Sequence, residues 1–132
     1  MPESRDHLEL VQTIVTYVTT TWTACKALAL LTDLPTLPAA TRPPRIASFI
    51  PDVYAADVPT TEVIIGEAKT LGDLETEHAR EQLKAFLGFL EHQKRGTLIV
   101  AVPWQARATA YNVTKRMGAT KARIIILDHV KR

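Results

Sequence analysis

The sequence predicts an α/β protein with a mixed central sheet flanked by helices, and three observations support this class. Apolar residues in the first quarter of the chain recur three and four positions apart, which is typical of a helix. The middle changes to an alternating, β-branched pattern typical of strands. The last third alternates between strand and helix. The expected order is α-β-β-β-α-β-α-β, in a single domain spanning residues 1–132.

The first expected element is a long amphipathic helix over residues 5–31. Its apolar stripe comprises Leu8, Val11, Val15, Val18, Trp22, Cys25 and Ala29. Threonines are frequent here and are mediocre helix formers, so this helix should depend on packing rather than on propensity. The single cysteine lies on the stripe and is expected to be a buried small hydrophobe. Prolines then predict a loop over residues 32–44.

Three strands and a helix are expected next. Residues 45–50 and 53–55 alternate as short strands, and residues 62–69 (EVIIGEAK) form a stronger, β-branched strand. Asp73 is a plausible N-cap, and apolar spacing continues the following helix to about residue 92.

The end of the chain is expected to add two strands and a helix. Gly96 should end the preceding helix, and residues 97–102 (TLIVAV) read as a strand. A helix over 105–117, closed by Gly118, is followed by a strand over 122–128 (ARIIILD). Both strands are apolar on both faces, which indicates central positions in a sheet that is covered on both sides.

Composition excludes several classes of protein. With 46% hydrophobic and 23% charged residues, the chain has the composition of a globular protein rather than a disordered one. One cysteine excludes an internal disulfide scaffold. No apolar run is long enough to cross a bilayer, and the N-terminus lacks the pattern of a secretory signal, so we expect a cytoplasmic protein without a membrane partner.

The charges divide sharply along the chain. Residues 1–93 contain 7 Lys and Arg against 13 Asp and Glu, whereas residues 94–132 contain 9 Lys and Arg against Asp128 alone. A basic third joined to an acidic remainder suits a protein that presents one face to a polyanion and keeps carboxylates for metal binding. A solvated basic surface would produce the same count.

One short motif combines acidic and basic side chains on a strand. Because side chains alternate along a strand, Glu67 and Lys69 share one face, and Ala68 points to the other. Asp52 precedes the hairpin that leads into this strand, so an antiparallel neighbour can bring it to Glu67. Two carboxylates and a lysine would then converge.

These residues resemble the PD-(D/E)xK nuclease superfamily, the restriction-endonuclease-like fold of Holliday-junction resolvases and small VRR-NUC-like nucleases. The resemblance rests on Pro51-Asp52, fourteen intervening residues, Glu67-Ala68-Lys69, and a following helix that contains Gln82. The expected order of elements is also similar, and the resemblance covers about residues 5–128.

The resemblance implies a Mg²⁺-dependent endonuclease that hydrolyses DNA phosphodiester bonds, with Mn²⁺ as a possible substitute. Asp52, Glu67 and the backbone carbonyl of Ala68 would bind the metal, because Mg²⁺ prefers oxygen ligands. Lys69 would orient the attacking water and help to deprotonate it, or stabilise developing negative charge. Gln82 matches a glutamine found in the corresponding helix of several branches.

In many members an acidic residue from the first helix completes the metal shell. Glu9 is the first choice here, with Asp6 and Glu3 as alternatives. Carboxylates near a helix start are also favoured by the helix dipole, whatever the chemistry. His78 lies one turn before Gln82 and could face the site or be a half-exposed helix residue.

The expected partner is DNA, which Arg107, Lys115 and Arg116 would grip through its phosphates. A chain of this size has no room for a separate recognition domain, so a homodimer or a partner protein is expected to help. The alternative is a non-catalytic nucleic-acid-binding or interaction module on the same fold. The sequence does not distinguish DNA from RNA, duplex from single-stranded or branched substrates, or endonuclease from exonuclease action.

Overall fold

The computed structural model describes residues 5–22, 29–33, 42–57, 61–118 and 120–129. The elements in chain order are α1 (Arg5–Thr21), β1 (Ala29–Thr32), β2 (Val53–Ala56), β3 (Glu62–Ala68), α2 (Leu71–Leu74), α3 (Glu77–Glu91), β4 (Arg95–Pro103), the 3₁₀ turn η2 (Trp104–Ala106), α4 (Arg107–Arg116) and β5 (Arg123–His129).

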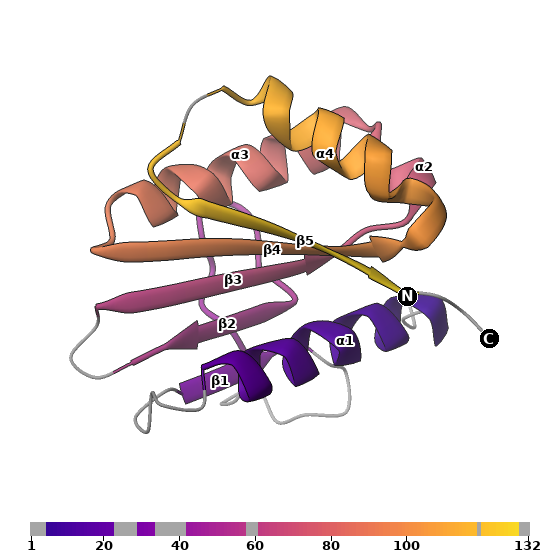
Figure 1. The fold of residues 1–132 in the computed structure, drawn as a ribbon. Helices are drawn as coiled ribbons and strands as arrows, with labels where there is room; N and C mark the ends of the chain where they lie inside the picture. Colours follow the sequence, from indigo (N-terminus) through magenta and orange to yellow (C-terminus); the bar gives the residue numbers. More distant parts are fainter. Residues whose placement is uncertain (1–4, 23–28, 34–41, 58–60, 119, 130–132) are drawn as a thin grey trace.

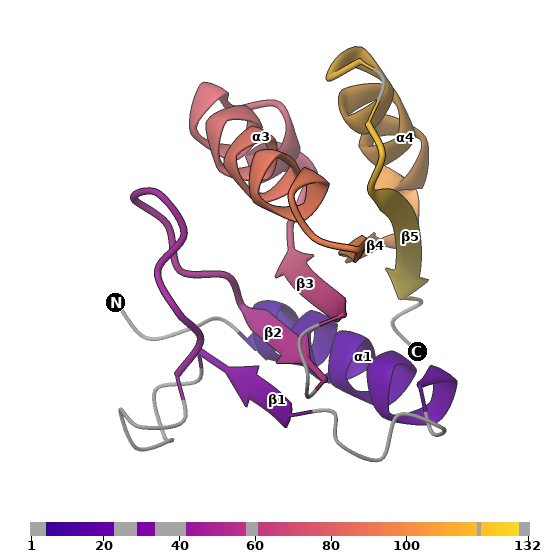
Figure 2. The same cartoon turned by 90° about the vertical axis from the view of Figure 1, so that its left-hand side faces the viewer.

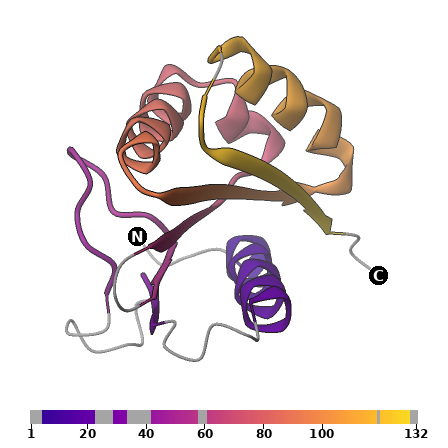
Figure 3. The same ribbon diagram turned by 60° about the vertical axis from the view of Figure 1, so that its left-hand side comes forward.

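The described strands form one mixed sheet in the order β1-β2-β3-β4-β5. The β1–β2 and β2–β3 pairs are antiparallel, whereas the β3–β4 and β4–β5 pairs are parallel. Helix α1 covers one face of the sheet, and α3 and α4 cover the other (Figures 1 and 3). The predicted class, an α/β protein with a mixed sheet between helices, is confirmed.

Two apolar layers hold this arrangement together. One lies between α1 and the sheet, and the other lies between the sheet and α3 and α4. Gly66 in β3 allows α1 to approach closely, because a Cβ there would lie 2.6 Å from Cγ2 of Ile14. The first helix is thus seated directly on the strand that carries Glu67.

The first helix is shorter than predicted, and its buried stripe is rotated. It ends at Thr21, and the predicted residues 29–31 belong to β1 instead, where Ala29 pairs with Ala56 across the sheet. The buried positions are Leu10, Val11, Ile14 and Val18, whereas Leu8 is 40% exposed. Low helix propensity and the available strand partner β2 explain the early end. Cys25 lies outside the described residues, as does most of the predicted loop.

The predicted strand 45–50 is wrong. Ile46 and Phe49 exchange backbone hydrogen bonds of 2.7 and 2.9 Å across a tight turn, and Ala47 within it has a φ of 54°. A left-handed residue cannot continue an extended strand. The predicted strands 53–55 and 62–69 are confirmed as β2 and β3.

The helix predicted from Asp73 is in fact two helices with threonine caps. Thr70 caps α2, and Asp73 is the third residue of that helix, where its carboxylate completes a capping box. Thr76 caps α3. Gly96 does not end α3 but lies within β4, where a Cβ would approach the Leu90 carbonyl oxygen to 2.7 Å.

The last two strands and the helix between them are present close to the predicted ranges. Gly118 follows α4 with a φ of 88°. The prediction that both strands are central is wrong for β5, which ends the described sheet. Figure 2 shows the layers on either side: α1 packs on one face of the sheet end and α4 on the other, so apolar residues on both faces do not require a strand on both edges.

None of the described helices is long and apolar enough to cross a bilayer.

Candidate functional site

The antiparallel β2–β3 pair brings the two predicted carboxylates together. Val53 lies opposite Gly66, so the residue before β2 lies beside the carboxyl end of β3. There the Asp52 amide donates to Oε1 of Glu67 at 2.9 Å. The Ala68 amide donates to Oδ2 of Asp52, also at 2.9 Å. Each carboxylate is therefore held by a backbone amide from the other's strand.

Lys69 and Gln82 complete this cluster. Nζ of Lys69 lies 3.2 Å from Oε2 of Glu67 and donates to Oε1 of Gln82 on α3. The alternation predicted for β3 is thus present, with Glu67 and Lys69 together on the α3 side. Glu67 is 2% exposed and Lys69 is 9% exposed. The geometry joins β3, the start of β2 and α3 in one buried polar network.

The electrostatics of the network leave Glu67 short of positive charge. Burial, and after it the negative charge of Asp52, raise the pKa of Glu67 from an ordinary value of 4.5 to about 8. Lys69 and the Asp52 amide lower this pKa, but by less than burial and the charge of Asp52 raise it. A cation placed beside this pair would favour the ionised carboxylate.

His7 is a member of the site that the sequence reasoning missed. Its Nε2 lies 3.3 Å from Oδ1 of Asp52, and its side chain is 22% exposed. The rotated stripe of α1 explains this, because His7 precedes Leu10, Val11 and Ile14 at the helical spacing of the buried face. Correct phasing of that stripe was the signal that would have found it.

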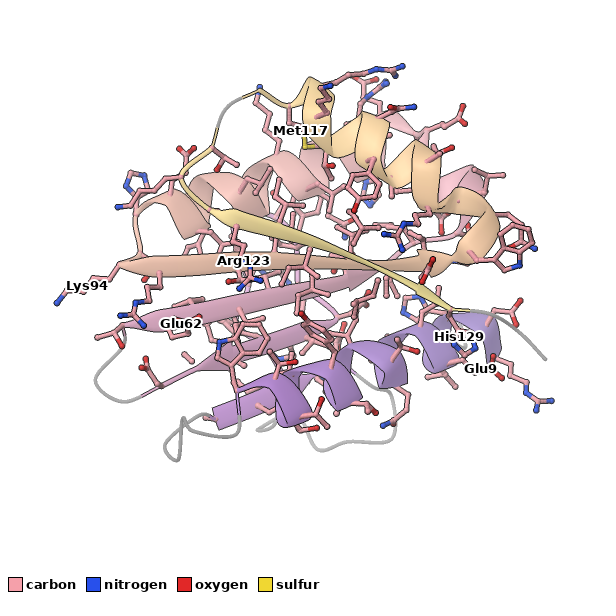
Figure 4. The ribbon with its side chains drawn as sticks, in the orientation of Figure 1. Glu9, Glu62, Lys94, Met117, Arg123 and His129 are labelled. Atoms are coloured by element: carbon pink, nitrogen blue, oxygen red, sulfur yellow. The ribbon has the colours of Figure 1, made fainter. Side chains whose placement is uncertain are left out.

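Glu9 lies at the same end of the molecule but points toward β5. Its Oε1 lies 3.4 Å from Nε of Arg5, and its Oε2 lies 3.6 Å from Nε2 of His129 (Figure 4). It lines a pocket of about 310 Å³ together with Asp6, Thr70, Trp104 and His129. Thr70 follows Lys69 directly, so this pocket opens next to the carboxylate cluster.

The described residues contain no group of three or more His, Cys, Asp or Glu side chains arranged to hold a metal ion. Glu9 as a third ligand, and the carbonyl of Ala68, therefore stay predictions. Asp6 lines the pocket beside Glu9, whereas Glu3 lies outside the described residues. His78 is exposed on α3 and packs edge to face on Phe49, with ring centroids 5.5 Å apart.

The three predicted phosphate-gripping residues are separated along α4. Arg107 begins the helix, with Nη1 3.0 Å from Oδ2 of Asp128 and its guanidinium carbon 5.6 Å from the centroid of the Tyr111 ring. Lys115 and Arg116 are exposed in its last turn, about 13 Å along the axis. Arg107 and the Lys115–Arg116 pair therefore lie at opposite ends of the helix.

Comparison with protein-family models, with curated proteins and with solved structures found no match to this chain.

Proposed function

We propose that this protein is a metal-dependent nuclease that hydrolyses phosphodiester bonds of DNA at the Asp52–Glu67–Lys69 cluster. The observation that supports this most directly is the reciprocal backbone clamp, in which the amides of Asp52 and Ala68 fix two carboxylates beside one lysine. This is the constellation that the PD-(D/E)xK resemblance implies.

The donor set fits Mg²⁺. Asp52 and Glu67 offer hard carboxylate oxygens, which Mg²⁺ prefers. Each oxygen that accepts one hydrogen bond keeps a second lone pair for a cation. The raised pKa of Glu67 supports the fit, because burial and the charge of Asp52 disfavour the ionised carboxylate and a bound cation would favour it. A bound Mg²⁺ would supply Lewis-acid activation of water and of the phosphate.

The chain's own residues would orient the substrate and stabilise charge. Lys69 is fixed between Glu67 and Gln82, so its amino group is held in place for a phosphate oxygen or for the attacking water. His7 would position Asp52 through their contact at 3.3 Å. The neighbouring pocket, with the 53% exposed Trp104 at its wall, offers room for the rest of the nucleotide.

The proposal includes DNA as the partner and a second copy of the chain, or a delivering protein, as the helper. It also includes a restriction-endonuclease-like arrangement for the fold.

The test combines cleavage and metal binding. The wild-type protein is incubated with linear, supercoiled, single-stranded and branched DNA in Mg²⁺ or Mn²⁺, beside Asp52→Asn and Glu67→Gln. We expect cleavage to fall by at least about 100-fold in both variants, and Mg²⁺ binding measured by calorimetry to weaken in both.

Glu77→Gln is the matched control, since Glu77 is an exposed carboxylate in the first turn of α3 and lies outside the cluster. It should cut at the wild-type rate. Equal cleavage by the wild type and the two site variants would contradict the proposal, because the activity would then come from elsewhere. Circular dichroism of each variant verifies that it is folded.

A further inference from the structure

A second charged site lies at the opposite end of the sheet from the carboxylate cluster. A groove of about 460 Å³ is bordered by Lys94, Arg95, Lys121 and Arg123. Trp22, Glu62 and Gln93 also line it. Figure 4 shows Lys94 and Glu62 at one end of the molecule, with Glu9 and His129 at the other. Strand β3 has seven residues between these ends, which is about 20 Å.

Parallel pairing explains why basic residues from distant parts of the chain meet here. Thr97 of β4 lies opposite Arg123 of β5, so both strands begin at the same edge of the sheet. Lys94 and Arg95 precede Thr97 by two or three positions, and Lys121 precedes Arg123 by two. The four positive charges therefore gather at the amino ends of two neighbouring strands.

These four side chains have no counter-ion within the described part of the chain. All four residues are exposed, and none makes an ion pair or a side-chain hydrogen bond to another described residue. The one carboxylate of the groove, Glu62, accepts instead from Nε1 of Trp22 at 3.0 Å. Four like charges around one hollow repel each other, and an anionic ligand would remove that cost.

We propose that this groove binds the phosphate backbone of a nucleic acid, as a second contact surface separate from the catalytic cluster. Two arginines supply forked donors that match phosphate oxygens, and two lysines supply point charges. The half-buried Trp22 ring at the wall is available for contact with a sugar or base. The nucleic-acid identity of the ligand rests on the proposed nuclease function.

The experiment measures binding of a fluorescein-labelled 20-base-pair DNA duplex by anisotropy, in EDTA, over a series of salt concentrations. The wild-type full chain is compared with a double variant that carries both Lys94→Ala and Arg123→Ala. Each lost phosphate contact removes one released counterion, so the slope of log K against log salt should become shallower by about 2. Affinity at low salt should fall by about tenfold or more.

The matched control is a double variant that carries both Arg45→Ala and Lys84→Ala. Both substituted residues are exposed and basic and lie outside the groove. It should change affinity by less than about twofold. A groove variant with wild-type affinity and slope would overturn the proposal. Binding of inorganic phosphate and of polyglutamate is measured with the same proteins. If the groove variant loses binding to either of these but binds the duplex like the wild type, the proposal is also overturned, because the ligand would then be a free phosphate or an acidic protein.

The failure of this proposal is distinguishable from failure of the nuclease proposal. Binding in EDTA does not require cleavage, so groove-dependent duplex binding by a protein that never cuts DNA supports the groove and contradicts only the nuclease. Cleavage that depends on Glu67, together with groove variants that bind like the wild type, overturns only the groove.

Discussion

The two ends of the sheet carry opposite charges and surround them differently. At the carboxyl end of β3, Glu67 is 2% exposed, and each of its carboxylate oxygens contacts a donor. At the amino ends of β4 and β5, Lys94 and Arg123 are exposed and have no counter-ion among the described residues. One end is an ordered polar network, and the other is an open positive surface.

Under the proposed function, this difference would separate two tasks of a nuclease. Charges in a dry site interact strongly and are held in place before the reaction, which suits chemistry. Exposed charges are screened within about 8 Å at physiological salt, so they attract and orient a polyanion but do little to a reaction barrier. The buried end is expected to control turnover, and the exposed end is expected to control binding.

The largest expected effect follows from removing Lys69. Lys69→Met should lower the turnover number for DNA cleavage by about 10²–10⁴-fold, while duplex affinity in EDTA changes by less than about threefold. Lys94→Met should do the reverse, with a raised KM and an unchanged kcat. Steady-state kinetics and anisotropy measure both quantities, and Lys84→Met serves as the control. If Lys94→Met lowers kcat as much as Lys69→Met does, the proposed division of turnover and binding between the two ends is wrong.

A second effect is the dependence of stability on pH in metal-free protein. Because the pKa of Glu67 is raised to about 8 from an ordinary value of 4.5, the folded state keeps a proton that the unfolded chain releases. The stability that Glu67 contributes should therefore be complete below pH 4.5 and decline as the pH rises to about 8. Urea unfolding at several pH values measures this decline, and Glu67→Gln should flatten it.

Asp57 provides an internal check on that profile. Hydrogen bonds from the Glu62 amide and from Thr61 lower its pKa to about 2. A depressed pKa contributes stability above the ordinary value of 3.8 and loses it as the pH falls toward 2. Its effect thus lies below the window of Glu67. A decline between pH 5 and 8 that persists in Glu67→Gln would show that another group is responsible.

A third, smaller effect concerns the glycines that let helices approach each end. Gly66→Ala would press a methyl group against Ile14, and Gly96→Ala would press one against the backbone of Leu90. Each should lower the free energy of unfolding by about 1–3 kcal/mol. Gly88 in α3 has no atom within 4 Å of an added Cβ, so Gly88→Ala should instead stabilise by about 0.5–1 kcal/mol.

The functional readouts should separate the two ends again. Gly66→Ala displaces α1 from β3 and should reduce cleavage more than duplex binding, and Gly96→Ala should reduce binding more than cleavage. Chemical denaturation, kinetics and anisotropy on the same three proteins provide the data. If both variants lose cleavage and binding equally, the two ends are mechanically coupled and the separation is wrong.

The sequence predicted correctly the feature of the site that depends only on neighbouring residues along the chain. The alternation along residues 62–69 placed Glu67 and Lys69 on one face, as the structure has them. The phase of α1 was predicted less well, because alternating three- and four-residue spacing fits two adjacent stripes. In the structure, the stripe that carries Ile14 packs against Gly66, and this phase brings His7 to Asp52.

Features that depend on pairing between distant segments were not predictable in the same way. Residues 29–31 were expected to continue the first helix, and they form a strand because β2 is available beside them. The groove residues Arg95 and Lys121 meet only because β4 and β5 are parallel and start at one edge. The charge count located the basic third of the chain, but the topology decides which of its residues converge.

The smallest expected effect concerns the residues that the sequence favoured for phosphate binding. A double variant that carries Lys115→Ala and Arg116→Ala loses two exposed charges from the last turn of α4. Neither residue borders the groove. Duplex affinity in EDTA should fall by less than about threefold, because these two charges lie outside the groove where four basic side chains converge. The salt slope should change by clearly less than in the groove variant. An equal or larger change would move the main binding surface to α4 and leave the groove without its proposed ligand.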